Sequence, residues 1–301
     1  MRVTHKLMAD NAIRHMDENL QRLYSLQEKI ASEKQFQRAS ENPSGAIAAL
    51  SLRSSLAISQ AYLDTAHLTD SWLSASDSAL SQMTDVARRA LNLVLKGAND
   101  TLSAVERRTM ASEIDSMVQE AVGVGNTSHQ GNFLFSGFKT TTKPFSLSDP
   151  DPDEDNLPAK VSYTGDNGTI LRNIGPEQSI PQNIDGNTIF QPVFDALVAA
   201  RKALKANDSG EIQTAIGLLQ NAFNGLGEAV TTNGARMRQV DLITSRIENT
   251  QIELRSLLSK KEDINMAEAI TALRYQETVY QAALEVGHRA ISALSLFDIM
   301  S

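Results

Sequence analysis

The hydrophobic positions near the two ends of the chain recur at the three- and four-residue spacing of one helix side. Near the N-terminus these positions are Ile13, Met16, Leu20, Leu23 and Ile30. Near the C-terminus they are Met266, Ile270, Leu273, Tyr280, Leu284, Ile291 and Leu294. The spacing predicts two amphipathic helices. Neither helix has an apolar partner beside it in sequence, so each should be covered by the other terminus or by another copy of the protein.

The first half of the chain continues this helical pattern. The N-terminal helix is expected over about residues 4–34. Asn42 followed by Pro43 indicates an N-cap and a first helical position, and the apolar spacing then runs to about Lys96. Ser103 and Glu106 have the spacing of a capping box, which predicts a further helix to about Gly123.

The second half returns to helix at about residues 192–206 and then carries a second long apolar pattern. Asp208 and Glu211 open it as a capping box, and it continues to Leu258. Roughly 50 helical residues span about 75 Å, so the two long helices are natural antiparallel partners. A few polar residues interrupt the two patterns, namely Asp70, Asp77, Thr84, Asn233, Thr244 and Gln251.

The middle of the chain differs, because glycine, proline, asparagine and β-forming residues collect between residues 132 and 190. We therefore expect a mainly α protein, an elongated antiparallel long-helix bundle or coiled coil with a small β-rich subdomain inserted at the tip. The predicted parts are terminal coiled-coil helices (1–42 with 264–301), a long-helix rod (43–131 with 191–263) and a variable subdomain (132–190).

Composition narrows the class of protein. Aromatic residues make up only 5% of the chain, with Trp72 the single tryptophan, whereas a globular enzyme of this size usually buries more large rings. The net charge of −8 without a basic run disfavours nucleic acid as a partner. The chain has no cysteine, which excludes disulfides and thiol chemistry. No apolar run is long enough for membrane insertion, and no secretory signal peptide is evident.

No pattern indicates catalysis, a cofactor or a metal site. The five histidines lack the spacing of metal ligands or of a catalytic motif. Residues 149–155 superficially resemble a calcium loop, but Glu154 replaces the required glycine and Lys160 the final glutamate. A solvated acidic loop is the better interpretation. An enzyme or binding module with its site in the β-rich subdomain remains the alternative from another class.

Several short strings, taken together and in order, resemble the bacterial flagellin family. They cover about residues 1–145 and 225–301. The N-terminal strings are Met1-Arg-Val-Thr4, Glu41-Asn-Pro-Ser-Gly-Ala46, Val86-Ala-Arg-Arg-Ala-Leu-Asn-Leu93, Ala98-Asn-Asp-Thr-Leu102 and Gly131-Asn-Phe-Leu-Phe-Ser-Gly137. The C-terminal strings are Gly234-Ala-Arg-Met237, Met266-Ala-Glu-Ala-Ile270 and Leu294-Ser-Leu-Phe-Asp298.

Within that family the chain most resembles the hook-associated members of the hook–filament junction. The resemblance implies a structural adaptor in the extracellular flagellum, exported by the type III apparatus without a cleavable signal peptide. The implied partners are copies of the chain in a ring, neighbouring hook-associated and filament subunits, and a cytoplasmic export chaperone on the C-terminal helix. Short filament flagellins share most of these features, so a self-polymerising flagellin is the alternative.

The resemblance also implies that the terminal helices pair as a coiled coil in the assembly. An isolated helix of about 30 residues is marginally stable in water, so we expect the ends to become ordered when neighbours bury them. A bundle already folded in the monomer is the alternative. The expected assembly residues are Ile13, Met16, Leu20, Leu23, Ile30, Ile270, Leu273, Tyr280, Leu284, Ile291 and Leu294.

Overall fold

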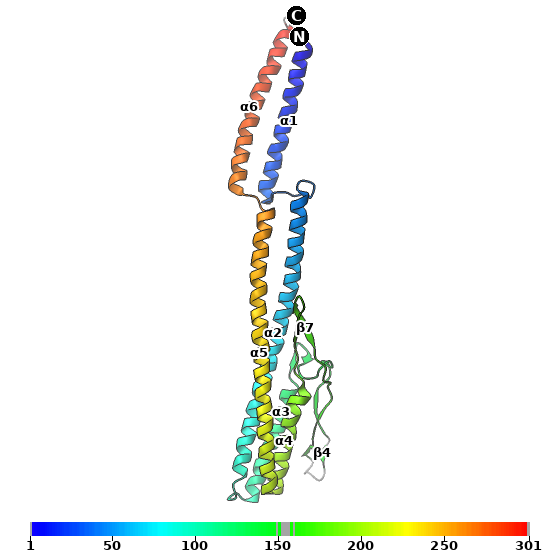
Figure 1. The fold of residues 1–301 in the computed structure, drawn as a ribbon, viewed down its shortest axis with the longest axis vertical. Coiled ribbons are helices and arrows are strands. Elements are labelled where there is room, and N and C mark those ends of the chain that lie inside the picture. The colour runs from blue at the N-terminus through cyan, green and yellow to red at the C-terminus, as the bar shows by residue number, and fades with distance from the viewer. Residues whose placement is uncertain (1, 149, 152–156, 159, 300–301) are drawn as a thin grey trace. The chain divides into compact units, whose positions relative to one another are not determined.

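The computed structural model describes residues 2–148, 150–151, 157–158 and 160–299 of the 301-residue chain. The chain divides into two compact units. The terminal unit comprises Met1–Ile58 and Thr250–Ser301, and the central unit comprises Ser59–Asn249. Both units are built mainly from helices (Figure 1).

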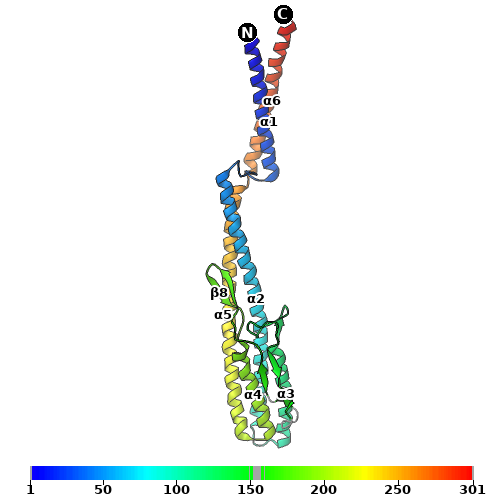
Figure 2. The same ribbon diagram turned by 90° about the vertical axis from the view of Figure 1, so that its right-hand side faces the viewer.

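The terminal unit contains the two end helices, α1 (Arg2–Ser32) and α6 (Met266–Ile299). They lie side by side in both views, with the chain ends together at one end of the pair (Figures 1 and 2). The unit also includes the beginning of α2 (Pro43–Gly97) and the end of α5 (Ser209–Glu262). Residues distant in sequence therefore meet in this unit.

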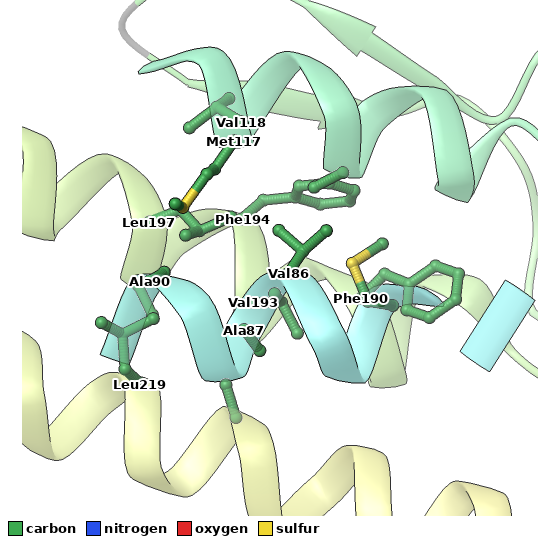
Figure 3. Close-up of a cluster of buried hydrophobic side chains, with 14 of the residues drawn as sticks. Val86, Ala87, Ala90, Met117, Val118, Phe190, Val193, Phe194, Leu197 and Leu219 are labelled. Carbon is green, nitrogen blue, oxygen red and sulfur yellow. The ribbon is translucent and has the colours of Figure 1, made fainter. Parts of the chain in front are cut away.

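The central unit is held by one large hydrophobic core to which α2, α3 (Ala104–Gly125), α4 (Gly186–Ala206) and α5 all contribute. Figure 3 shows how side chains from these helices interdigitate. Those labelled are Val86, Ala87 and Ala90 of α2, Met117 and Val118 of α3, Phe190, Val193, Phe194 and Leu197 of α4, and Leu219 of α5. Because all of them are buried, this unit is stable by its own packing.

Short antiparallel strand pairs occupy the segment between α3 and α4. The pairs are β1 (Ser128–His129) with β2 (Asn132–Phe133), β3 (Phe145–Leu147) with β6 (Val161–Tyr163), β4 (Pro150–Asp151) with β5 (Leu157–Pro158), and β7 (Leu171–Gly175) with β8 (Gln178–Pro181). They lie alongside the helices of the central unit (Figure 2). Ile174 and Ile180 of the β7–β8 hairpin pack against Leu73 of α2 and Val240 of α5.

A tight loop after β2 is held by one aspartate. The carboxylate of Asp166 accepts hydrogen bonds from the amides of Phe138 (2.7 Å) and Gly168 (2.9 Å), and these bonds lower its pKa. Gly137 has a φ of +67° in this loop, and a side chain there would overlap the backbone of Asp166. Burial raises the pKa of the neighbouring Tyr163 to about 12, with smaller contributions from Asp185 and Asp166.

The predicted fold class is confirmed, and the predicted caps explain where several helices begin. The hydroxyl of Ser103 accepts from the amide of Glu106, while the Glu106 carboxylate accepts from the amide of Ser103 (2.7 Å). Asn42 accepts from the amide of Gly45 at the start of α2 (3.0 Å). The expected start of α4 was wrong, because the helix begins at Gly186 with Asp185 as its N-cap and accommodates Pro192 internally.

Polar residues that interrupt the two long apolar patterns pair with each other. The fully buried Asn233 of α5 donates its amide to the carbonyl of Leu73 (3.0 Å) and to the carboxylate of Asp77 (3.3 Å) on α2. A buried amide that has these partners on one neighbouring helix favours one register of the two helices. Asn233 and Asp77 therefore form a specific contact between α2 and α5 within the central unit.

A buried ion pair ties α3 to α4. The guanidinium of Arg201 donates to the carboxylate of Asp115 at 2.8 Å, and the Arg201 side chain is almost completely buried. Replacing Arg201 by methionine would leave the Asp115 charge without this partner. Because an uncompensated buried charge is costly, we expect R201M to lower the free energy of unfolding by about 3–5 kcal/mol, measured by urea denaturation followed through Trp72 fluorescence.

Lys202 provides the matched control for this change. It lies next to Arg201 on α4, and its side chain is exposed. K202M removes the same charge from the same helix and should change the free energy of unfolding by about 1 kcal/mol or less. Equal effects of R201M and K202M would show that the buried pair has no special role.

Candidate assembly interface

The two end helices approach each other closely at Gly287 of α6. Gly287 is buried, and a side chain at this position would overlap the terminal methyl group of Met16 on α1. Further along the pair, the Gln276 amide donates to the Asn19 carbonyl oxygens, at 3.1 Å for the side chain and 3.3 Å for the backbone. Gly287 thus allows the two helices to approach closely, and the Asn19–Gln276 contact adds a polar link between them.

The pair buries little of its own apolar surface. Among the side chains that the structure describes, α1 has none in the buried class, and α6 has only Ala269 and Gly287. Both are small, so they contribute little to the hydrophobic free energy of the pair. The larger apolar residues of the end helices are therefore either partly buried or exposed, and the exposed ones are available to another surface.

The predicted assembly residues fall into three groups. Ile13, Ile270 and Leu284 are exposed by 47%, 40% and 44%. A second group is partly buried along the α1–α6 contact, namely Met16, Leu20, Leu23, Ile30, Leu273 and Tyr280. Ile291 and Leu294 belong to α6 but lie outside the residues whose side chains the structure describes. The exposed group and the partly buried group thus lie together on the α1–α6 pair.

Exposed apolar residues on the pair also include positions that the sequence pattern missed. They are Leu7 and Tyr24 on α1, and Tyr275 and Val286 on α6. By helical spacing, Tyr24 lies beside the main apolar side of α1, whereas Leu7, Tyr275 and Val286 lie on the opposite side of their helices, so a search for a single repeating side does not select them. The end helices therefore expose apolar residues on more than one side.

The beginning of α2 carries a further exposed apolar side within the same unit. Ile47, Leu50 and Ile58 are all exposed. Residues 42–63 contain one charged side chain, Arg53, so this surface is also unusually poor in charge. The sequence signal was present, since positions 47, 50, 54, 57 and 61 keep helical spacing, but the inward pattern at Leu52, Leu56 and Leu63 masked it.

The two interhelical linkers of the terminal unit are joined through their backbones. The amide of Gln35 donates to the carbonyl of Glu262 (2.7 Å), and the amide of Ile264 donates to the carbonyl of Glu33 (2.9 Å). Between them, Lys34 and Asp263 form an isolated antiparallel bridge. The end of α1 and the beginning of α6 are thereby fixed next to each other.

Four charged side chains surround this bridge, and we call them the junction clamp: Lys34, Arg53, Glu262 and Asp263. The Lys34 ammonium lies 2.7 Å from the Asp263 carboxylate and 3.7 Å from that of Glu262, which also pairs with Arg53. The hydrogen bond between Lys34 and Asp263 raises the pKa of Lys34 and lowers that of Asp263. Both shifts favour the charged forms that the clamp uses.

Among the described residues, no group of three or more histidine, aspartate or glutamate side chains could hold a metal ion. The acidic segment at 149–155 lies almost entirely outside the described residues. The Ser71 hydroxyl is 3.1 Å from His129, whose ring packs edge-on against Trp72. Within the described part of the chain, no helix is both long and apolar enough to span a membrane.

Comparison with known proteins identifies the family to which these helices are related. Residues 3–140 match the bacterial flagellin N-terminal helical region. This stretch of the chain is therefore similar to the N-terminal helices of bacterial flagellins. This stretch contains α1, α2 and α3, and so includes the N-terminal half of the end-helix pair. The resemblance inferred from the short strings is confirmed.

Relatives extend the similarity to the whole chain. Flagellar hook-associated protein 3 of Escherichia coli is 21% identical, with 99% of each chain covered. The protein of the same name from Salmonella typhimurium is 19% identical, again with 99% of each covered. A flagellin of Listeria innocua is 21% identical and covers 95% of this chain and 94% of its own length.

Solved structures share the fold. A putative flagellar hook-associated protein from Vibrio parahaemolyticus has a TM-score of 0.62 at 19% identity, covering 74% of this chain and all of its own. FlgL of Bacillus cereus has a TM-score of 0.60 at 18% identity, covering 69% and 99%. The flagellar junction protein FlgL of Legionella pneumophila reaches 0.55 at 12%, covering 72% and 100%.

The junction clamp should depend on pH in a defined way. Because the pKa of Asp263 is lowered, its contribution is present above about pH 4 and is lost as the pH falls through that lowered value. Because the pKa of Lys34 is raised, its contribution is present below 10.5 and is lost as the pH rises through the raised value. Protection factors of the Gln35 and Ile264 amides should therefore be level between about pH 5 and 9 and fall on both sides.

The substitution Asp263→Asn tests how much of this pH dependence comes from the Lys34–Asp263 pair. The substitution should lower the protection factors at neutral pH and flatten their decrease in acid, measured by amide hydrogen exchange. Glu262 also faces the Lys34 ammonium, so some acid dependence should persist. If the protection factors of D263N fell in acid as steeply as those of the parent protein, the role assigned to the Lys34–Asp263 pair would be contradicted.

Proposed function

We propose that this chain is a structural adaptor of the bacterial flagellum that joins the hook to the filament. The named relatives support this assignment, since hook-associated protein 3 of two organisms matches over nearly the full chain. The observation that carries the mechanism is the apolar surface left exposed on α1 and α6. Two helices that leave large apolar residues exposed beside their mutual contact are suited to completing their burial in an assembly.

We further propose which parts of the chain serve the assembly. Residues 1–42 with 264–301 provide the assembly helices, residues 43–131 with 191–263 the long-helix support, and residues 132–190 a variable insertion. The assembly interface comprises the predicted residues of α1 and α6. Exposed Ile47, Leu50 and Ile58 add a second surface that neighbouring subunits could cover, because apolar surface poor in charge is typical of interface cores.

The proposed partners follow from the same role. Copies of the chain form a ring, with hook-associated subunits on one side and filament subunits on the other. Before export, a cytoplasmic chaperone covers the exposed side of α6, which would otherwise offer Ile270 and Leu284 to non-specific contacts. The chain acts outside the cell, in the flagellum, and its role is structural, not catalytic.

A filament flagellin is the second candidate, because a Listeria flagellin is as similar in identity as the hook-associated relative. A deletion strain distinguishes the two. We expect a strain without this chain to build bare hooks and release flagellin into the medium, seen by electron microscopy and by assay of the culture fluid. Long filaments growing from the purified protein alone would instead support the flagellin role.

Leu284→Asp tests the assembly surface directly. Burying an aspartate in place of leucine should cost about 3 kcal/mol or more at each copy of the interface. We expect severe loss of swimming in soft agar, with hooks lacking filaments. Leu284 is exposed in the monomer, so the Trp72 fluorescence and helix content of the purified protein should stay the same.

Gln281→Asp is the matched control, because Gln281 is exposed on the same helix and the substitution introduces the same charge. This variant should swim nearly as well as the parent. Normal motility of L284D, or equal loss in L284D and Q281D, would refute the assignment of Leu284 to the interface.

A further inference from the structure

The junction clamp contains one carboxylate that differs from its partners. The Glu262 side chain is only 9% exposed, whereas those of Lys34, Arg53 and Asp263 are all more than a third exposed. One Glu262 oxygen faces Lys34 and Arg53, and the other is buried without a hydrogen-bond partner among the described residues. A buried charge in this setting is costly unless its cationic partners remain in place.

Glu262 connects separate parts of the terminal unit. It is the last residue of α5, its backbone carbonyl accepts from Gln35 in the first linker, and its side chain pairs with Arg53 of α2. The adjacent Asp263 binds Lys34 from the same linker. Loss of the Glu262 charge would therefore remove the ion pair with Arg53 and one of the two carboxylates that face Lys34, at the point where the two linkers meet.

The backbone at this junction also requires support. Glu33, which directly follows α1, has a φ of +57°, a conformation that is unfavourable for a residue other than glycine. In this conformation its carbonyl accepts from the Ile264 amide (2.9 Å). The bridge and the clamp thus hold the chain reversal at the end of α1 in place.

The end helices depend on this junction because they have little core of their own. Joining two weakly interacting segments at one end raises their effective concentration and makes their pairing intramolecular. We propose that Glu262 is a positioning residue that holds the two linkers together, so that α1 and α6 present their exposed apolar residues as one surface. This proposal rests on the function proposed above, for which that surface is the assembly interface.

The test uses the full-length protein as a dilute monomer and exploits the lack of cysteine in the chain. Asn19→Cys with Gln276→Cys places two thiols where the α1 and α6 side chains meet, and the rate of disulfide formation on addition of diamide reports their pairing. In this background we expect Glu262→Gln to slow cross-linking about tenfold or more. Arg53→Gln should slow it in the same direction.

Two controls separate positioning from general stability. Glu253→Gln removes the same charge from an exposed position of α5 in the same unit and should leave the rate unchanged. Trp72, the single tryptophan, is buried in the central unit, so its fluorescence should give the same urea midpoint in all variants.

The proposal is overturned if E262Q cross-links at the parent rate, if E253Q slows it equally, or if the Trp72 midpoint falls with E262Q. Failure of the parent pair to cross-link would overturn it as well, since α1 and α6 would then not be paired in solution. None of these measurements involves other flagellar subunits. Their outcome is therefore independent of the deletion strain, which tests the proposed function itself.

Discussion

Two helices packed only against each other can cover one side of each, and this constraint governs the terminal unit. The contact between α1 and α6 includes Gly287 against Met16 and the polar pair Asn19–Gln276, and other apolar residues of both helices are only partly buried. Larger apolar residues such as Ile13 and Leu284 remain exposed beside it. The α1–α6 pair therefore has a defined arrangement but gains little hydrophobic free energy from it. A further surface is needed to bury the apolar residues that remain exposed.

The central unit shows the contrasting solution. Its large core draws on four helices and several strands, so the aromatic rings of Phe135, Phe145 and Phe190 are fully buried. Two of its buried polar side chains have defined partners, as in the Arg201–Asp115 ion pair and the amide contacts of Asn233. The central unit thus buries its own core, whereas the end helices keep apolar residues exposed. This combination suits a subunit that joins others.

The junction clamp accounts for how so little packing can still align the end helices. Backbone bonds through Gln35 and Ile264 fix the two linkers, and Lys34, Arg53, Glu262 and Asp263 surround them with paired charges. Electrostatic contacts between partly exposed groups are individually weak, but here they act at a single point of chain reversal. The order of the end helices can thus be set locally while their apolar surface stays available.

The sequence by itself determined the helices, their caps and the amphipathic ends, because periodicity and capping act over three or four residues. Asn42, Ser103 and Glu106 cap their helices as their spacing predicted. Only the tertiary structure decided which apolar residues remain exposed, including Ile47 and Tyr275, and which polar ones pair. The Asn233–Asp77 contact joins residues that are 156 positions apart in the sequence, and the Lys34–Asp263 contact joins residues that are 229 positions apart. No local pattern encodes contacts over such separations.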